Sequence, residues 1–467
     1  MSYTRERTGR TGEVRPEDVH EVLRSHMLAD GFDFVLDLDR SRGAYLYDQR
    51  NGRRFLDLFT FFASNPLGMN HPRLRNDEFI AKIGRVALNK PSNSDVYTVE
   101  MAEFVRTFFN IAVPEDFLYA FFISGGALAV ENGLKTAIDW KVRKNLAAGR
   151  EETLGTKVMH FRQAFHGRTG YTMSLTNTDP NKVRFWPKFT DWPRVPNPWA
   201  EFPLEGENLQ RTIDRETEAL EAINRAFSEH PNDIACIILE PIQGEGGDNH
   251  FRPEFLAELR AICDREETML MFDEVQTGIG LTGEMWAFQT LGVTPDIVAF
   301  GKKAQVCGII VTGRVDEVEE NVFHKSSRIN STWGGNLVDM VRFQRYLEII
   351  DEENLLENSR EVGAYLLDQI ESLADRNAEL LSNARGRGLM CAVTVATAEE
   401  RDAILKGCVE RGVMIIGCGE RTIRFHPPLN LTKEQVDEGM TALSGAIEEV
   451  LGRSALTGQR RPTATNR

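Results

Sequence analysis

The sequence predicts an α/β fold, with a large domain built on a mostly parallel, doubly wound sheet and a small α+β domain. From about residue 95 to 335, short apolar runs alternate with helical patterns, as in parallel sheets whose faces are covered by helices. After about residue 340 the pattern changes to long helices with short strands. A chain of 467 residues also exceeds the size of one simple core, so two or three domains are expected.

The elements follow in chain order. Residues 43–58, "GAYLYDQRNGRRFLDL", predict a β-hairpin that turns at Asn51-Gly52. The expected strands of the large domain are "YAFFIS", "VMHF", "IACIILEP", "TMLMFDE" and "DIVAFG", and each ends in polar or glycine-rich residues. The pattern "PEFLAELRAICDREE" predicts a helix between two of them. In the small domain, "LMCAVTVA" and "TIRFHP" predict short strands.

Three parts are expected from this pattern. Residues 1–75 form an N-terminal segment that contributes to the small domain, residues 76–340 the large domain, and residues 341–467 the C-terminal small domain. The ends, residues 1 to about 15 and 453–467, are polar and lack periodicity, which predicts frayed termini.

Composition excludes several classes of function. Lys+Arg 55 against Asp+Glu 70 gives a net charge of −15, which argues against nucleic acid or an anionic membrane as a partner. The longest apolar runs are far shorter than a membrane span, and the N-terminus lacks the apolar core of a secretory signal. The six cysteines have neither metal-ligand nor disulfide spacing. We therefore expect reduced thiols, no metal site and a cytoplasmic protein.

In a doubly wound sheet, ligands bind beyond the carboxyl ends of the strands. The polar or glycine residues expected there are Gly125, Gly126, His166, Glu240, Asp273, Gln276, Lys302 and Lys303. The stretch "GIGLTG" (278–283) matches a dinucleotide-binding pattern, but "EVQT" separates it from the strand and no helix begins within it. A match outside its structural context is weak, so we do not interpret it as a nicotinamide site.

Two glycine-rich segments are candidate phosphate sites. In "FISGGALAVENGLKTAIDW" a strand runs into Ser-Gly-Gly and a helix follows. Backbone N–H groups at such a helix start can converge on an anion, although a tight turn without a ligand explains the glycines equally well. In "NSTWGGN" (330–336), Thr332 and paired glycines are the second candidate.

Lys302 and Lys303 stand side by side after the apolar run "PDIVAF". Two ammonium groups at that place repel each other and lose hydration, unless one of them is not a simple ammonium. A phosphate cradle, a strand-end carboxylate at Asp273 and a strand-end lysine together meet the needs of pyridoxal phosphate. The lysine supplies the Schiff base, and the carboxylate keeps the pyridine nitrogen protonated.

The stretch "MFDEVQTGIGLTGEMWAF…PDIVAFGKK" resembles the class III (ω-amino acid) aminotransferases, which are fold type I PLP-dependent transferases. The similarity extends from "FLDLFTFFASNPLGMNHP" to "TIRFHPPLNLT". The segments "NKPSNSDVYT", "FHGRTGYTMSLTNT", "FGKKAQVCG" and "NSTWGGN" are most similar to the L-lysine 6-aminotransferase branch. The resemblance implies a homodimer with two active sites at the subunit interface, and a large domain that binds pyridoxal 5'-phosphate.

In this family the Schiff-base lysine follows the Asp of the "PD" pair by six residues, which selects Lys302 after Asp296. Consecutive side chains of an extended segment point to opposite faces, so Lys303 is expected to be structural. Its charge is expected to lower the pKa of Lys302. In this sequence "AQVCG" stands where many members carry a double glycine.

The resemblance also implies the cofactor contacts. Asp273 pairs with the pyridine nitrogen, Gln276 binds the ring hydroxyl and Phe165 stacks on the ring. Gly126 and Ala127 bind the phosphate together with Thr332 of the partner subunit. Without the family, an ordinary core aromatic would be the preferred reading of Phe165.

The implied reaction transfers the ε-amino group of L-lysine to 2-oxoglutarate. Its products are L-2-aminoadipate 6-semialdehyde, which cyclises to piperideine-6-carboxylate, and L-glutamate. The expected substrate-binding residues are Arg168, Arg424, Glu245 and Asn330. Glu245 is expected to pair with Arg424 during the lysine half-reaction, and Lys302 to act as general base. The alternatives are another ω-aminotransferase, acting on ornithine or GABA, and a PLP aminomutase.

Overall fold

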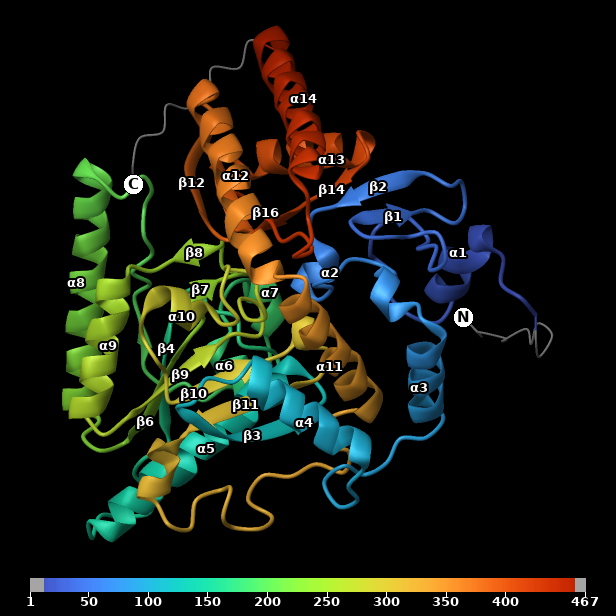
Figure 1. Cartoon of the computed structure of the whole chain (residues 1–467). Helices are drawn as coiled ribbons and strands as arrows, with labels where there is room; N and C mark the ends of the chain where they lie inside the picture. The colour runs from blue at the N-terminus through green and yellow to red at the C-terminus, as the bar shows by residue number, and fades with distance from the viewer. Residues whose placement is uncertain (1–11, 458–467) are drawn as a thin grey trace, which may run out of the picture.

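The large part of the molecule is built on a seven-stranded sheet, seen in Figure 1 of the computed structural model, which describes residues 12–457. In spatial order its strands are β3 (Phe117–Ile123), β11 (Cys307–Thr312), β10 (Ile297–Phe300), β9 (Met269–Asp273), β6 (Ile234–Leu239), β4 (Lys157–Phe161) and β5 (Arg194–Val195). All neighbouring pairs are parallel except those of β11, which runs antiparallel to both β3 and β10. The predicted mostly parallel sheet is confirmed, and β11 is a strand that the patterns above do not predict.

The central strands are apolar along their whole length because helices cover both faces of the sheet. Every residue of β6, β9 and β10 is buried. Alternate residues enter two different cores: Met269 and Met271 join one cluster with α5 (Gly126–Ala147), while Leu270 and Phe272 join another with α9 (Pro253–Arg265). In Figure 1, α9 and α8 (Gly206–Glu229) lie together on one side of the sheet. Because successive side chains of a strand point to opposite faces, one sheet contributes to two cores.

The second part combines both ends of the chain. A four-stranded antiparallel sheet holds β12 (Leu381–Arg387), β13 (Met390–Val395), β16 (Thr422–Phe425) and β15 (Ile416–Cys418). Helices α12 (Leu355–Arg376), α13 (Ala398–Glu410) and α14 (Lys433–Thr457) lie with it in the upper part of Figure 1. Helices α4 (Val99–Ile111) and α11 (Leu337–Glu352) pack against each other.

The N-terminal hairpin is tied to the C-terminal residues. Strands β1 (Tyr45–Tyr47) and β2 (Arg54–Asp57) pair antiparallel around Asn51-Gly52, as predicted. Gly52 has φ 71°, a left-handed conformation that glycine adopts without strain. Strand β14 (Val413–Met414) then adds to β2 in parallel.

At the C-terminus, α14 continues to Thr457, so the expectation of a frayed end is wrong for residues 453–457. Residues 12–15 have no regular secondary structure, and residues 1–11 and 458–467 lie outside the described residues. The domain boundaries at residues 75 and 340 stay a prediction.

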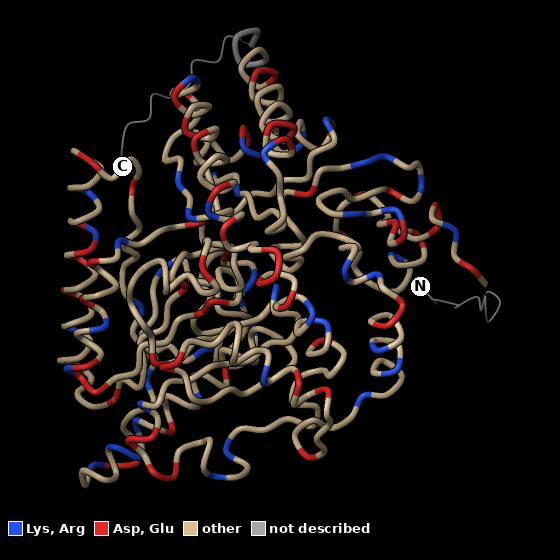
Figure 2. The backbone as a smooth tube through the Cα atoms, viewed as in Figure 1, with Lys and Arg blue, Asp and Glu red and all other residues tan. Residues whose placement is uncertain are grey.

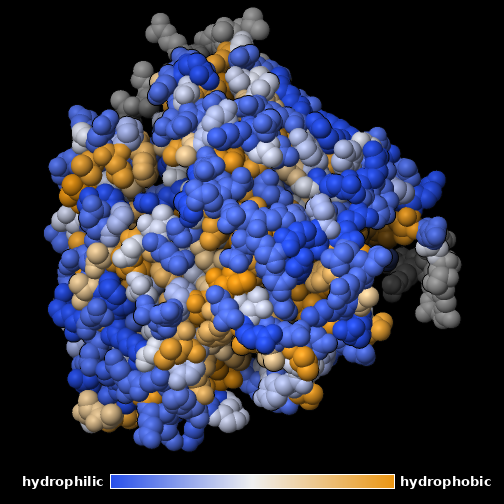
Figure 3. All heavy atoms as spheres, in the orientation of Figure 1, coloured by the Kyte–Doolittle hydropathy of each residue, from blue (hydrophilic) through white to orange (hydrophobic). Residues whose placement is uncertain are grey.

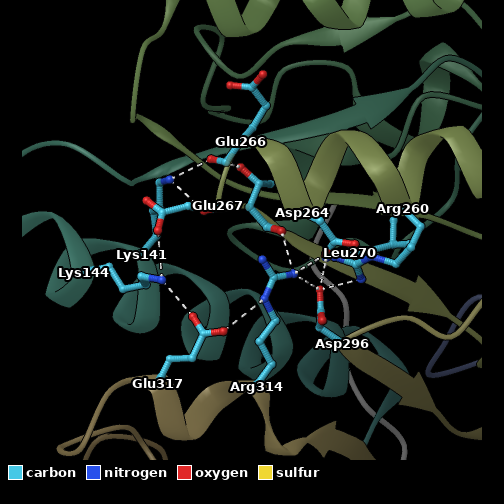
Figure 4. A network of polar contacts seen from close by, with 11 residues as sticks. Lys141, Lys144, Arg260, Asp264, Glu266, Glu267, Leu270, Asp296, Arg314 and Glu317 are labelled. Atoms are coloured by element: carbon cyan, nitrogen blue, oxygen red, sulfur yellow. Dashed lines mark hydrogen bonds and ion pairs between the residues drawn. The ribbon is translucent and has the colours of Figure 1, made fainter.

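Ion pairs and hydrogen bonds stabilise the end of the sheet that lies away from the candidate site. Asp296, just before β10, accepts hydrogen bonds from Arg260 Nη1 (2.8 Å), Arg314 Nη1 (3.1 Å) and the backbone N–H of Leu270 (2.7 Å), as Figure 4 shows. Nearby, buried Lys141 donates to the carbonyl oxygens of two residues in the turn before β9. These contacts fix the amino ends of β9 and β10 to the helices beside them.

Charged residues lie mostly at the periphery of the molecule (Figure 2). Figure 2 places Lys, Arg, Asp and Glu mostly on the peripheral helices and loops, with few in the centre of the sheet. The face in Figure 3 is largely hydrophilic and carries separate apolar patches. Within residues 12–457, no helix has the length and apolar character needed to cross a bilayer.

Candidate active site

The two adjacent lysines occupy a tight turn rather than an extended segment. Lys302 opens a short 3-10 helix, Lys302–Ala304, and has φ 49°, which is unusual for a residue with a side chain. Buried Lys303 donates from Nζ to the carbonyl oxygens of Gln276 and Ala63. The expectation of an extended segment is therefore wrong, but the turn still gives the two side chains different surroundings. Backbone strain of this kind clusters at functional sites.

Lys302 lies among charged groups that set its pKa. Burial and the neighbouring Arg424 guanidinium lower the pKa of Lys302 to about 8, against the opposing effects of Glu240, Asp273 and Glu245. The sequence predicts Lys303 as the cation with this effect. In the structure Arg424 is the cation that lowers the pKa of Lys302, whereas burial and the neighbouring Lys302 lower the pKa of Lys303 itself well below its usual value. A pKa of about 8 leaves part of the amine unprotonated near neutral pH.

Asp273 is the last residue of β9, and its carboxylate is held by two donors. Its Oδ2 lies 2.8 Å from His166 Nδ1, and its Oδ1 accepts the backbone N–H of Val275 at 3.1 Å. The other ring nitrogen of His166, Nε2, is buried and has no hydrogen-bond partner in the described part of the chain. His166 is expected at a strand end from the sequence, but no local pattern gives it a role. Only the long-range contact with Asp273 reveals one.

A second carboxylate, Glu240, fixes the loops around Asp273. It accepts the backbone N–H groups of Phe165 (2.9 Å) and Gly244 (3.0 Å). Burial and the nearby Asp273 charge raise the pKa of Glu240 to about 7, while His166 and the two N–H groups oppose that shift. Glu240 thereby holds the loop that carries Phe165 against the strand ends.

The N-terminus of α5 meets the other site segments through close backbone approaches. Gly125, with φ 114°, precedes the helix and provides no side-chain cap. A Cβ on Gly126 would lie 3.1 Å from Val275 Cγ1, and one on Gly301 would lie 3.5 Å from the same atom. A Cβ on Gly167 would lie 2.4 Å from Ala127 Cβ. The start of α5, the segment after Asp273, the lysine turn and the Phe165 loop therefore converge on one place.

Gln276 begins a buried polar chain that leads to Arg424. Its Nε2 lies 3.3 Å from His426 Nδ1, and His426 Nε2 lies 3.1 Å from Asp248 Oδ2. Asp248 Oδ1 is 3.6 Å from Arg424 Nη1. Burial lowers the pKa of His426 to about 4 although Asp248 opposes the shift, so its ring is neutral. The chain links the proposed contact of the ring hydroxyl to the proposed carboxylate clamp.

Arg424 is buried and incompletely paired. In residues 12–457, its Nε and Nη1 have no hydrogen-bond acceptor. Burial works to lower its pKa, but Cys418, Asp248 and Glu245 together raise it above the usual value. A buried guanidinium with unpaired donors can bind a carboxylate.

Glu245 forms a different ion pair from the expected one. Its Oε1 pairs with Lys182 Nζ, from the short helix α7 (Pro180–Val183). Lys182 Nζ also lies 5.7 Å from the centre of the Phe165 ring, which places the pair beside the candidate cofactor position. The expected Glu245–Arg424 pair is replaced here by Glu245–Lys182, between residues 63 positions apart. Nothing in the local sequence marks Lys182 as the partner.

Three of the expected site residues are exposed: Arg168, Asn330 and Thr332. The Thr332 carbonyl accepts the hydroxyl of Ser92 at 2.5 Å, and Asn330 Oδ1 accepts the N–H of Ser331 at 2.7 Å. No hydrogen bond in the described chain joins Thr332 to Gly126 or Ala127. The assignment of Arg168, Asn330 and Thr332 to the site stays a prediction, and that of Thr332 depends on a second subunit.

The converging groups fit pyridoxal phosphate. A lysine with a lowered pKa, a buried carboxylate at a strand end and an uncapped helix N-terminus match the aldehyde, the pyridine nitrogen and the phosphate of that cofactor. The unpaired donors of Arg424 leave a place for a substrate carboxylate.

Comparisons with known proteins agree with this chemistry. Residues 28–447 match the family described as aminotransferase class-III. The L-lysine-epsilon aminotransferase of Mycobacterium tuberculosis (strain ATCC 25618 / H37Rv) is 52% identical over 436 residues, which cover 93% of this chain and 96% of that protein. The protein of the same name from Amycolatopsis lactamdurans is 50% identical over 432 residues, 92% of this chain and 95% of its own.

A more distant relative and a solved structure complete the comparison. The mitochondrial 4-aminobutyrate aminotransferase of Sus scrofa is 31% identical over 435 residues, 89% of this chain and 85% of its own. The solved structure described as lysine aminotransferase from M. tuberculosis in the internal aldimine form has a TM-score of 0.92 at 51% identity, covering 94% of this chain and 100% of that one.

Proposed function

Because the chain belongs to the class-III aminotransferases, which are fold type I pyridoxal-phosphate enzymes, we propose that it transfers the ε-amino group of L-lysine to 2-oxoglutarate. The products are L-2-aminoadipate 6-semialdehyde, which cyclises to piperideine-6-carboxylate, and L-glutamate. The observation that carries the choice of lysine is the contrast between 52% identity to a lysine enzyme and 31% to a 4-aminobutyrate enzyme, each over most of the chain.

Bound pyridoxal phosphate supplies an aldehyde that takes up amines and a protonated ring that withdraws electrons. Lys302 is the amine that would hold the aldehyde, and Asp273 the carboxylate that would keep the ring nitrogen protonated. His166 supports this role because its contact with Asp273 Oδ2 at 2.8 Å fixes the direction of the carboxylate. Gln276 would bind the ring hydroxyl, and Phe165 would cover one face and exclude water.

The phosphate would be held at the N-terminus of α5. Gly126 and Ala127 provide backbone N–H groups there, where the helix dipole favours an anion. Thr332 of the partner subunit would add a hydroxyl. This arrangement requires a homodimer, which we propose as the active form.

Lys302 would also move protons. Its pKa of about 8 allows the amine to accept a proton at Nζ near neutral pH and to return it. Burial and Arg424 cause this shift, so Arg424 contributes to proton transfer as well as to binding.

Two arginines would orient the two substrates. Arg168 would bind the α-carboxylate of lysine, which leaves the ε-amine as the reacting group, with Asn330 nearby. Arg424 would bind the α-carboxylate of 2-oxoglutarate or glutamate, since a planar guanidinium binds a carboxylate through two parallel hydrogen bonds. Glu245 lies close enough to influence Arg424 electrostatically, so its position decides whether Arg424 is available.

We also propose that the enzyme acts in the cytoplasm. All six cysteines are unpaired in the structure, five of them buried, and a reducing compartment maintains thiols in this form. The acidic net charge of −15 gives no support to nucleic acid or an anionic membrane as a partner.

The test is to incubate the purified protein with L-lysine and 2-oxoglutarate and to identify the products. We expect glutamate and piperideine-6-carboxylate in equal amounts, and much slower reaction with ornithine or 4-aminobutyrate. A rearranged lysine isomer without glutamate would instead indicate an aminomutase. A preparation without the cofactor's absorption, unaffected by hydroxylamine, would contradict the assignment of a PLP enzyme.

A further inference from the structure

The ion pair between Glu245 and Lys182 joins a loop of the candidate site to the short helix α7. Both side chains are about one-third exposed, 32% for Glu245 and 29% for Lys182. An ion pair at this depth is weak and can exchange partners. Lys182 also faces the Phe165 ring, so the pair lies at the candidate site.

Two further cations, Arg424 and Lys302, lie within electrostatic reach of Glu245, and of these Arg424 is the proposed carboxylate clamp. It is buried, and its only ion-pair contact in the described residues is a loose one of 3.6 Å to Asp248. Arg424 Nε and Nη1 and Asp248 Oδ1 all lack hydrogen-bond partners in residues 12–457. Asp248 therefore stabilises the charge without occupying the donors, and an acceptor from outside is still needed.

Glu245 has two alternative partners with opposite consequences. When Glu245 pairs with Arg424, its carboxylate would occupy the N–H donors that a substrate carboxylate needs. When Glu245 pairs with Lys182, as it does in the structure, the N–H donors of Arg424 stay free. The balance between the two positions depends on how well each cation holds the carboxylate.

We propose that Lys182 is a specificity-determining residue, which holds Glu245 away from Arg424 and so opens Arg424 to dicarboxylic substrates. The inference deepens the proposed function and rests on its assignment of Arg424 as the carboxylate clamp. Lys182 acts through Glu245 and does not touch the reacting atoms, so it is a positioning residue. Without Lys182, the carboxylate turns toward Arg424 and competes with the substrate.

The first variant is Lys182→Gln, which removes the charge and leaves a polar side chain that is one atom shorter. The matched control is Arg184→Gln, which removes one positive charge from the same segment. Arg184 is exposed and its guanidinium lies over the Phe185 ring, 4.6 Å from its centre. Lys182→Arg restores the cation and serves as the conservative rescue.

The principal readout is binding of glutarate, a dicarboxylate without a reacting group, to each holoenzyme by calorimetry. We expect Lys182→Gln to weaken glutarate binding by about fivefold, the size of change that follows from losing a partly exposed ion pair. Arg184→Gln and Lys182→Arg should bind glutarate with an affinity within about twofold of that of the wild type. Any remaining difference would be a long-range effect of the changed charge, which salt screens. The glutamate half-reaction should show a higher KM, whereas the lysine half-reaction should not slow.

A double substitution separates two ways in which Lys182 could act. In a Glu245→Gln background the movable carboxylate is gone, so Lys182→Gln should have no further effect on glutarate. If it still weakens binding, Lys182 attracts the ligand directly and the proposal is overturned. Equal effects of Lys182→Gln and Arg184→Gln would overturn it as well. Failure of the wild type to use lysine would refute the proposed function instead, while the glutarate titration would still decide the role of Lys182.

Discussion

At the scale of single residues, Lys302 and Lys303 differ in what their ammonium groups meet. Lys302 faces Arg424 and three carboxylates, whereas Lys303 is buried against two backbone carbonyls. We predict that Lys302→Ala lowers turnover by roughly three powers of ten or more, since it removes the amine that we propose transfers protons. Lys303→Met should keep most of the activity per folded molecule and lose thermal stability.

The assignment can be checked without any variant. Reduction of the holoenzyme with borohydride, followed by peptide mapping, locates the lysine that carries the cofactor. We expect the label on Lys302. A label on Lys303 would reverse the assignment and leave the two carbonyl contacts of Lys303 unexplained.

Asp273 gives a second prediction at this scale. Asp273→Asn keeps the shape of the side chain but removes the charge that would hold the ring nitrogen protonated. The rate of a single turnover should fall by about three powers of ten, the size of a major electrostatic contribution. Cofactor content should stay high, because the proposed phosphate contacts at α5 do not involve Asp273. Single-turnover spectroscopy of the fully loaded variant measures both, and a near-normal rate would show that Asp273 is not the ring partner.

At the scale of elements, the amino ends of β9 and β10 depend on Asp296. Its carboxylate accepts hydrogen bonds from Arg260, Arg314 and the backbone N–H of Leu270 (Figure 4). Asp296→Asn should lower the free energy of unfolding by about 3 kcal/mol, since it leaves poorly exposed cations without their central partner. Activity per folded molecule should not change, because the site lies at the opposite ends of the strands.

Asp264 is the matched control, since it contacts the same two arginines but is 60% exposed. Asp264→Asn should lower the free energy of unfolding by less than about 1 kcal/mol. Urea unfolding of both variants, followed by circular dichroism, measures the difference. Equal losses would show that burial of Asp296 is not what makes its contacts valuable.

The alternation of strands and helices was enough to predict the sheet, because strands buried on both faces must be apolar throughout. The same logic located Asp273 and Lys302 at strand ends. The turn at Lys302 could not be predicted, since its φ of 49° depends on packing around the turn rather than on residue preference. The His166–Asp273 and Lys182–Glu245 contacts join residues 107 and 63 positions apart, beyond the reach of any local pattern.

At the scale of the whole molecule, each site of the proposed homodimer needs residues from two subunits. Thr332 is exposed in one chain, and its carbonyl is bound to Ser92, which leaves the hydroxyl available to a partner. We predict that Lys302→Ala and Thr332→Asp, each nearly inactive alone, regain activity when mixed under conditions that exchange subunits. The mixed dimer then contains one site with neither substitution.

The expected recovery is up to about a quarter of wild-type activity per active site, since half of the dimers are mixed and each has one intact site. No recovery, with subunit exchange shown by mass spectrometry, would place Thr332 in the site of its own chain. Recovery would establish that each site takes residues from both subunits.

In the proposed reaction the terminal nitrogen of lysine, and not the α-nitrogen, passes to the oxo acid. This transfer is tested most directly with two samples of L-lysine, labelled with nitrogen-15 at the ε or at the α position, each reacted with 2-oxoglutarate. Mass spectrometry of the glutamate formed then shows which nitrogen was transferred. We predict labelled glutamate from the ε-labelled sample alone, with the α-label kept in piperideine-6-carboxylate. Label in glutamate from the α-labelled sample would contradict the account.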